Sequence, residues 1–421
     1  MRVSEPDDCL NAKWKESRTD PVREELAVKG ESPAFDFIRG LFPPTTGDPA
    51  FDRNVIEGNA ERLETVPEIR TGHPFLDLSV KTGLAFIDAT FQGDHPKYGV
   101  KGYGENCHDG FPPTIIAATD ALSSWGLGAR AAQLFRYWLA HFVRADGTVK
   151  YRGTSLAELG QLLHTASLLE ERIGPNGWWN DGRASLKRIV EGLLALQSEA
   201  DEHDGLLVGV PEDDERRKIG RYFHNNAWVA KGLQRWADLC ERQWVSPASL
   251  SDQARSAGNA VQEDTLDAIR RCWPEDPADW WLPPQVEPLE RPQFLTDTRA
   301  ASYTNYRYWP ELLSSGILPV AMAERIVNAR LTAGGQFCGM TRFADGLDDW
   351  PLAEYLYGLW RLGRRDDFLL SLYGHVAYHQ AEGHLTAYEQ VTFPPGREKT
   401  AYCLPCQLVA ARAARLLVGG M

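Results

Sequence analysis

Apolar residues recur at three- and four-residue spacing along most of the chain after about residue 70, which is the pattern of helices that bury one face. Before that point Pro, Gly and charged residues occur without sustained periodicity, as in GLFPPTTGDPAFDRN. The periodicity predicts twelve helices, near residues 75–91, 112–125, 129–144, 155–172, 183–199, 224–242, 247–271, 300–313, 319–332, 350–362, 366–380 and 400–417.

The connections between these helices alternate in length. Short ones such as WGLG and LGRR follow the even-numbered helices, and long ones follow the odd-numbered helices. This alternation predicts six antiparallel hairpins, which close into an all-α, double-layered (α/α)6 barrel. We therefore expect a barrel domain over residues 75–421 and an irregular N-terminal arm, residues 1–74, packed on it. Two separate helical bundles are the alternative, but no Ser/Gly-rich or Pro-rich linker in the middle of the chain favours them.

In such a barrel the long connections all lie on one face, around the mouth of the central cavity. Long ordered loops usually carry function. The even-numbered helices begin at this mouth, so their N-termini direct partial positive charge and free N–H groups towards a bound ligand. The mouth of the barrel is therefore the predicted functional site.

Composition excludes several classes of partner. The chain has 45 Lys and Arg against 58 Asp and Glu, and the net charge of -13 repels nucleic acid and anionic membranes. No uncharged apolar run reaches the length of a membrane-spanning helix, and the N-terminal MRVSEPDDCLNAKWKE has no apolar leader segment. The odd count of 7 cysteines argues against a disulfide framework. We expect a cytoplasmic protein with reduced thiols.

Acidic residues gather in the long connections. Cleaving a glycosidic bond requires one protonated carboxyl to donate to the leaving oxygen and one ionised carboxyl to act as base or nucleophile. Two carboxyls in different environments can divide these roles. Aromatic residues make up 10% of the chain, and their flat rings suit stacking on sugar faces. The candidate acids are Asp109, Asp204, Glu212, Asp348, Asp349 and Glu389.

Two segments resemble the glucoamylases and the wider six-hairpin glycosidases. GHLTAYEQV, followed by a terminal apolar helix, resembles the last catalytic segment of that family, in which a Glu-Gln pair carries the general base. CHDGFPPTIIAATDAL is similar to the early segment in which a basic residue and an Asp open a helix and bind the sugar. By hairpin order the resemblance covers residues 75 to 417. It implies Glu389 as the general base and His108 and Asp109 as sugar ligands.

The same family places its general acid between the fifth and sixth helices, here within GLLVGVPEDDERRKIGRYF. The chain departs from the family in two places, because PEDDE replaces a Trp-Glu-Glu motif and His108 replaces an Arg. The resemblance therefore implies an acid in this loop without identifying it. We choose Glu212, since it comes first after the apolar run LLVGVP, and keep Asp213 and Asp204 as rivals.

The resemblance implies a glycoside hydrolase that acts on a small carbohydrate, an oligosaccharide or glycoside, with inversion at the anomeric carbon. It implies no metal ion and no organic cofactor. DGLDDWPLAEY is similar to helix-opening motifs whose Asp and Trp line the sugar pocket in related six-hairpin families. The predicted substrate-binding residues are His108, Asp109, Asp204, Asp348, Asp349, Trp350, Tyr388 and Gln390.

Other functions remain open at this point. A sugar epimerase or polysaccharide lyase also occurs on (α/α) barrels and abstracts a carbon-bound proton with His or Tyr, which would give His108, Tyr222 and His224 the central roles. A terpenoid cyclase would use the aspartates of ADGLDDW as its acid. A non-catalytic sugar-binding protein is the third alternative.

Some motifs favour purely structural roles. Ser155 stands three residues before Glu158, which predicts a capping box at the start of a helix. His375 and His379 are four residues apart on a predicted helix, but Val376 occupies the position of a zinc protease's Glu, so a metal site is disfavoured. CLPC near the C-terminus lacks a βαβ context and predicts structural cysteines.

Overall fold

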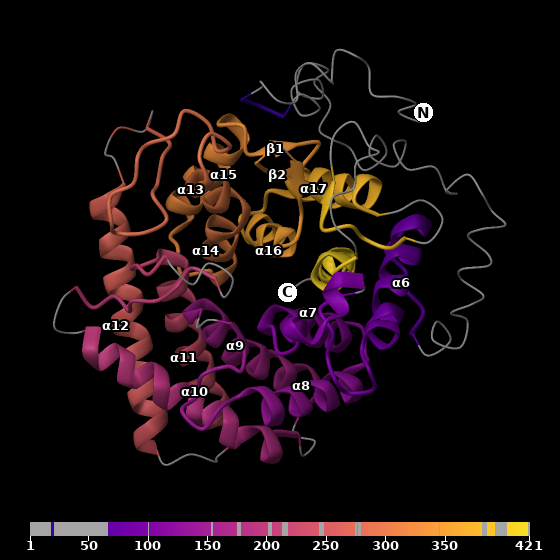
Figure 1. Cartoon of the computed structure of the whole chain (residues 1–421), viewed down its shortest axis with the longest axis vertical. Coiled ribbons are helices and arrows are strands. Elements are labelled where there is room, and N and C mark those ends of the chain that lie inside the picture. The colour runs from indigo at the N-terminus through magenta and orange to yellow at the C-terminus, as the bar shows by residue number, and fades with distance from the viewer. Residues whose placement is uncertain are drawn as a thin grey trace.

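The computed structural model shows a ring of helices around a central axis (Figure 1). The chain runs around the ring from α6 (Pro74–Thr90), drawn in indigo, and ends in a yellow helix that packs against α6. The structure describes residues 18–20, 66–99, 101–152, 155–174, 178–200, 204–212, 218–243, 248–273, 276, 279–344, 346–380, 385–391 and 402–419.

Six helices form an inner ring. Each packs against the next in the ring, and the last returns to the first. A short helix, α13 (Arg299–Tyr303), and a π-helical turn, η3 (Thr304–Tyr308), lead directly into the fourth inner helix, and α18 (Leu404–Gln407) precedes the sixth. Closure of this ring confirms the predicted (α/α)6 barrel. The inner helices are α7 (Pro112–Ser124), α9 (Leu156–Ile173), α11 (Phe223–Gln243), α14 (Trp309–Ser315), α16 (Leu352–Arg361) and α19 (Val409–Gly419).

The outer helices alternate with the inner ones along the chain. Several pack directly on an inner neighbour, as α8 does on α7, α12 on α11 and α17 on α16. One of them, α10, begins before the predicted residue 183, because Trp178 and Trp179 are buried there and the Trp178 indole donates to Glu170 (3.0 Å). Besides α6, the outer helices are α8 (Gly128–Phe142), α10 (Trp178–Ala200), α12 (Ala248–Cys272), α15 (Val320–Thr332) and α17 (Arg365–Tyr378).

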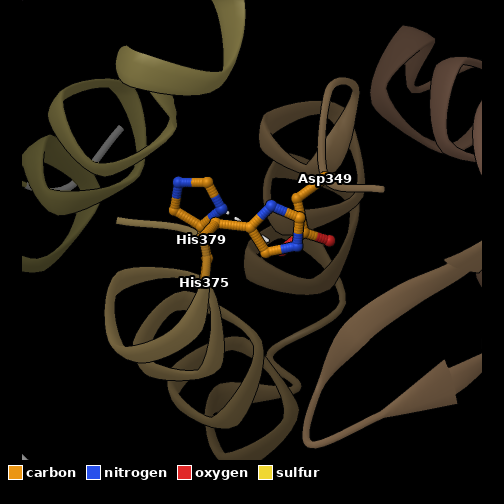
Figure 2. Close-up of side chains that lie close together, drawn as sticks. All are labelled: Asp349, His375 and His379. Atoms are coloured by element: carbon orange, nitrogen blue, oxygen red, sulfur yellow. Dashed lines mark hydrogen bonds and ion pairs between the residues drawn. The ribbon is translucent and has the colours of Figure 1, made fainter. Parts of the chain in front are cut away.

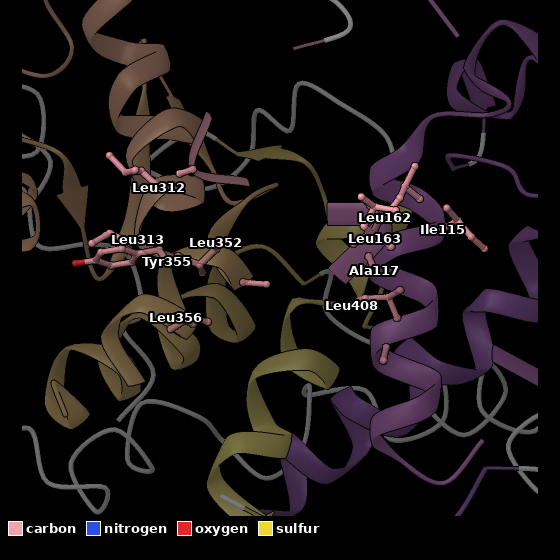
Figure 3. Packing of buried hydrophobic residues seen from close by; sticks show 14 of the residues in the cluster. Ile115, Ala117, Leu162, Leu163, Leu312, Leu313, Leu352, Tyr355, Leu356 and Leu408 are labelled. Atoms are coloured by element: carbon pink, nitrogen blue, oxygen red, sulfur yellow. The ribbon is translucent and has the colours of Figure 1, made fainter. Parts of the chain in front are cut away.

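The inner helices bury apolar side chains between them, and each fully buried large aliphatic side chain contributes about 1.5–3 kcal/mol. Helices α9 and α11 approach especially closely, since a Cβ at Gly160 would lie 2.0 Å from the carbonyl oxygen of Trp228. Only glycine is compatible with that approach. Figure 3 shows buried side chains of four inner helices and of the turn before α19, among them Ile115, Leu162, Leu163, Leu312, Leu313, Leu352, Leu356 and Leu408.

A buried polar cluster joins four of the inner helices. Asp120 of α7 accepts hydrogen bonds from Arg172 of α9 (2.8 Å), Arg412 of α19 (2.8 Å) and the Tyr357 hydroxyl of α16 (2.7 Å). Arg412 also donates to Glu354 of α16 (2.7 Å). Burial raises the pKa of Asp120, but the two guanidinium groups lower it more, and the net pKa lies well below the usual range. Asp120 therefore remains an anion at the closure of the ring.

Replacing Asp120 by asparagine should lower the free energy of unfolding at pH 7 by about 2–3 kcal/mol, because the buried Arg412 and its neighbour Arg172 lose their anionic partner. The pKa of Asp120 is lower in the folded than in the unfolded state, so its contribution to stability is fully present above the unfolded-state pKa of about 3.9 and is lost as the pH falls towards the folded-state pKa. Urea unfolding of both proteins should show this difference shrinking from about pH 5 to about pH 3. A difference that stays constant over that range would contradict the assignment.

The helical pattern did not predict a small antiparallel sheet at the mouth of the barrel. Its strands are β1 (Gln336–Phe337), β2 (Met340–Phe343), β3 (Gly346–Asp348) and β4 (Gln390–Val391), paired in that order. Strand β3 pairs with β4 so that Asp348 lies opposite Gln390. The sheet therefore joins the connection before α16 to the connection before α18.

Most of the predicted N-terminal arm, residues 1–74, lies outside the described residues. Where the arm is described, the Gly339 amide donates to Asp20 (2.6 Å) and the Arg18 guanidinium lies over the Phe294 ring (4.6 Å). The six cysteines in the described part of the chain are free thiols. Among the same residues, none of the helices combines the length and apolarity that crossing a bilayer requires.

Candidate active site

A cavity of about 140 Å³, as outlined by the described residues, lies where the long connections meet. Its lining comes from the connections before α7, α9, α11, α16 and α18 and from the α13–η3 segment. Eight aromatic residues line it: Tyr98, Tyr103, Phe111, Tyr151, Tyr303, Tyr306, Phe343 and Trp350. Six polar residues complete the lining: His108, Glu212, Arg307, Asp348, Glu389 and Gln390.

Glu389 lines this cavity and immediately precedes β4. Its neighbour Tyr388 forms an isolated bridge with Tyr402, and Gln390 begins the strand, so the backbone on both sides of Glu389 is fixed. The Tyr103 hydroxyl donates a hydrogen bond to the Glu389 carboxylate. Burial and the charge of Glu389 raise the pKa of Tyr103 well above its usual range, so this hydroxyl keeps its proton and remains a donor.

Asp348 is the second carboxyl on this side of the cavity and is only 1% exposed. Its oxygens accept hydrogen bonds from the Trp350 backbone amide (3.1 Å) and from the Gln390 side chain (2.8 Å). Burial raises the pKa of Asp348 well above its usual range, and the negative charge of Glu389 raises it further. Both effects favour the protonated form of Asp348, next to Glu389.

Glu212 lines the cavity as part of a buried cluster around one arginine. Arg307 donates to Glu212 (2.6 Å), Glu158 (2.6 Å) and Glu311 (2.7 Å), and is itself 1% exposed. Burial lowers the pKa of Arg307, but the three carboxylates raise it more, so the guanidinium stays charged. Burial raises the pKa of Glu311 to about 8, although the charge of Arg307 lowers it. In the described structure Glu212 is the member of the three that reaches the cavity.

The first turn of α11 positions the backbone before Glu212. The Asn225 side-chain amide donates to the Val210 carbonyl (2.8 Å), and His224 Nε2 donates to the Pro211 carbonyl (3.0 Å). Val210 also forms a parallel bridge with Ser155 at the start of α9. Two inner helices therefore place Glu212 at the mouth of the barrel.

Aromatic rings form a continuous wall of the cavity. The Phe111 ring lies 5.3 Å from that of Tyr98 and 5.8 Å from that of Trp350, and Arg307 lies 4.9 Å above the Trp350 ring. Tyr306 and Arg307 both belong to the π-helical turn η3. Such turns occur frequently at functional sites. The wall offers flat apolar faces of the kind that stack on sugar rings.

The structure brings six of the predicted site residues to the cavity: Glu212, Glu389, His108, Asp348, Trp350 and Gln390. Their predicted roles are not tested by this placement, but their convergence from four separate connections is. His108 ends the short 3-10 turn η2 (Asn106–His108), where its ring lies 5.7 Å from Tyr98 and 5.5 Å from Tyr103.

The other four predicted ligands lie outside the cavity lining in the described structure. Asp109 forms ion pairs with Lys97 (2.9 Å) and His95 (2.7 Å), and Asp204 pairs with Arg221 (2.6 Å). Both carboxylates are therefore engaged by partners outside the described cavity lining. Tyr388 and Asp349 also lie outside it. The Tyr388 carbonyl oxygen lies 3.0 Å from His379 Nδ1, and the Asp349 carboxylate contacts the buried side chains of His375 and His379.

Residues proposed for the alternative functions are placed as follows. His224 is buried and stacks on Tyr308 (4.6 Å), and neither it nor Tyr222 belongs to the cavity lining in the described structure. Of the three candidate proton-abstracting residues, His108 alone reaches the described cavity. Asp213 and the first aspartate of ADGLDDW lie outside the described residues.

Sequence reasoning missed the arginine cluster. The capping-box prediction for Ser155 and Glu158 was wrong, because the Ser155 side chain makes no capping hydrogen bond within the described helix and Glu158 binds Arg307. A signal was present, since Arg307 and Glu311 are four residues apart in an aromatic helical segment. Tyr103, the donor to Glu389, had no distinguishing pattern around it.

Comparison with known proteins gives matches in structure only. Neither protein-family models nor curated protein sequences match the chain. A solved structure named as a wild-type glycosidase aligns with a TM-score of 0.60, 12% identity and coverage of 82% of this chain and 98% of that one. The chain has the fold of the six-hairpin glycosidases.

Two further structures share the six-hairpin fold. One is a metal-independent alpha mannosidase from Streptococcus pneumoniae in complex with alpha-1,6-mannobiose, with a TM-score of 0.57, 10% identity and coverage of 87% of this chain and 98% of that one. The other is a bacterial glucoamylase complexed with acarbose, with a TM-score of 0.55, 11% identity and coverage of 86% of this chain and 57% of that one. At such identities the likeness establishes the fold alone.

Proposed function

We propose that the protein is a glycoside hydrolase that cleaves a glycosidic bond in an oligosaccharide or small glycoside with inversion at the anomeric carbon. The observation that carries the proposal is the cavity, in which an aromatic wall encloses three carboxyls, Glu212, Asp348 and Glu389. The mannosidase and glucoamylase that share the fold were solved with mannobiose and acarbose, and this supports a carbohydrate ligand here.

Glu389 is proposed as the general base that activates water. A base must be ionised, and a proton on the neighbouring Asp348, which burial and the adjacent charge favour, would support this state. The Tyr103 hydroxyl orients the Glu389 carboxylate by donating to it. When protonated, Asp348 would add a second donor next to Glu389.

Glu212 is proposed as the general acid that protonates the leaving oxygen. It comes from the connection before α11 and so from a part of the lining separate from Glu389. Of its rivals, Asp204 is held by Arg221, outside the described cavity lining. Arg307 supplies one positive charge to three carboxyls, and this shortage of charge supports retention of protons within the cluster.

The remaining lining suits a neutral sugar. The rings of Trp350 and Phe111 can stack on its faces, while His108 and Gln390 present hydrogen-bonding groups to its hydroxyls. Acid-base cleavage by two carboxyls needs no metal ion and no organic cofactor.

The proposal is tested by product analysis. The protein is incubated with gluco-, manno- and rhamno-configured disaccharides and aryl glycosides, and proton NMR follows the first anomer released. We expect hydrolysis of at least one glycoside and an inverted first anomer. A retained first anomer would exclude inversion, and an unsaturated product absorbing in the ultraviolet would replace hydrolysis by a lyase reaction.

A further inference from the structure

A cluster of three possible metal ligands lies outside the described cavity lining. Asp349 follows β3, and His375 and His379 lie at the end of α17, with His379 as its C-cap. All three side chains are fully buried. Figure 2 shows the two imidazoles and the carboxylate of Asp349 gathered at one point. One ligand atom from each residue lies within 4.8 Å of the other two.

The hydrogen bonding of His379 determines which of its nitrogens carries a proton. Nδ1 lies 3.0 Å from the Tyr388 carbonyl oxygen, which can only accept, so Nδ1 is the donor. The Nε2 atom of a neutral imidazole then presents a lone pair, and it faces the Asp349 Oδ2 atom at 3.3 Å. Two acceptor atoms directed at each other need either a proton or a metal ion between them.

The distances distinguish a metal ion from a shared proton. His375 Nδ1 and His379 Nε2 lie 3.2 Å and 3.3 Å from the same Oδ2 atom of Asp349. A charge-assisted hydrogen bond between imidazolium and carboxylate is shorter, at about 2.7–2.9 Å. Ligand atoms on a tetrahedral zinc ion, with bonds of about 2.0–2.1 Å, are separated by about 3.3 Å. The two separations from Asp349 match the second arrangement, and the two histidine ligand atoms lie within 4.8 Å of each other.

Backbone groups orient two of the three ligands, Asp349 and His379. The Thr341 amide donates to the Asp349 Oδ1 atom (2.8 Å), and the Tyr388 carbonyl accepts from His379. Partners of this kind orient ligands in metal sites, because each leaves one ligand atom directed at the ion. The Nε2 atoms of His375 and His379 are buried and have no hydrogen-bond partner among the described residues.

We propose that Asp349, His375 and His379 bind a transition-metal ion, with Zn²⁺ as the preferred ion. Two imidazoles and one carboxylate suit zinc better than calcium or magnesium, which prefer oxygen ligands. The ion would be structural. It would tie the end of β3 to α17 and so fix the adjacent Asp348 in the cavity wall. Because the ligands are buried, binding accompanies folding.

Sequence analysis disfavoured this site because a zinc protease's Glu is missing between the two histidines. The third ligand instead comes from Asp349, which is 26 residues before His375 in sequence. The proposal does not rest on the glycosidase assignment, since it uses no residue of the described cavity lining.

The test uses the full chain without a histidine tag. The protein is unfolded in guanidinium with EDTA, then refolded with two equivalents of ZnCl₂, with two equivalents of CoCl₂, or with EDTA alone. Bound metal is measured by mass spectrometry after gel filtration. We expect one metal ion per chain, visible absorption bands from bound Co²⁺, and a Tm several degrees above that of the EDTA sample.

Variants locate the site. His379→Gln and Asp349→Asn should lose the stoichiometric metal and give the same Tm with zinc and with EDTA. His141→Gln is the matched control, because His141 is exposed on α8, and it should bind metal like the wild type. The wild-type comparison decides the question alone if a variant does not fold. Substoichiometric metal in the refolded wild type, or equal binding by both variants, would reduce the cluster to a hydrogen-bonded one.

Discussion

Replacing Glu389 by glutamine is expected to lower turnover of a cleaved glycoside by about 10²- to 10⁴-fold, the usual contribution of a general base. Glutamine has nearly the same shape and can still accept from Tyr103, so the fold and the aromatic wall should be unchanged. What it lacks is the ionised carboxylate that removes a proton from water. The ratio of kcat values for the two proteins measures the effect.

Two controls make this result specific. Glu105→Gln changes an exposed glutamate in a neighbouring connection and should leave turnover unchanged. The pH profile gives a second readout, because loss of the base should remove the acidic limb of the bell-shaped dependence of kcat/KM. Near-normal activity of Glu389→Gln, or an unaltered profile, would exclude Glu389 from the mechanism.

The fold was largely predictable from the sequence because it rests on local patterns. Helical periodicity marks each buried face, and alternating connection lengths determine which helices are neighbours. The helix starting at Trp178 shows the limit, since two buried tryptophans extend it past the predicted boundary. The small sheet shows another, because β3 and β4 are paired across 42 residues by strands of two or three residues. Strands this short have no measurable periodicity.

The sequence indicates which connections reach the cavity, but it does not indicate which side chains of a connection point into it. Asp348 and Asp349 are adjacent at the end of a strand, so their side chains point to opposite sides. Asp348 therefore lines the cavity, while Asp349 faces His375 and His379. A single sequence offers no means of choosing between the two.

The arginine cluster could not be predicted from the sequence, since its ion pairs span long separations. Arg307 and Glu311 are four residues apart where η3 runs into α14, but Glu212 and Glu158 lie 95 and 149 residues away from Arg307. Only closure of the inner ring brings α9, the connection before α11 and α14 to one guanidinium. The cluster therefore forms only when the barrel closes. Its ion pairs in turn link these three segments and stabilise the closed ring.

Replacing Arg307 by methionine should lower the free energy of unfolding at pH 7 by about 3–5 kcal/mol, because the buried carboxyls of Glu158, Glu212 and Glu311 lose their shared cation. Methionine keeps much of the apolar volume beside Trp350, so the loss reports charge more than packing. Urea unfolding followed by tryptophan fluorescence and far-UV circular dichroism gives the difference.

The pH dependence separates this explanation from a simple packing defect. In the variant the orphaned carboxyls become neutral as the pH falls, so the deficit relative to the wild type should shrink from pH 7 towards about pH 5. Arg299→Met is the matched control, because Arg299 is exposed at the start of α13, the helix that leads into η3. This substitution should change the free energy of unfolding by no more than about 0.5 kcal/mol. A deficit that is equal at both pH values would mean that Arg307 acts through its volume, and Glu212 would then need another source of its orientation.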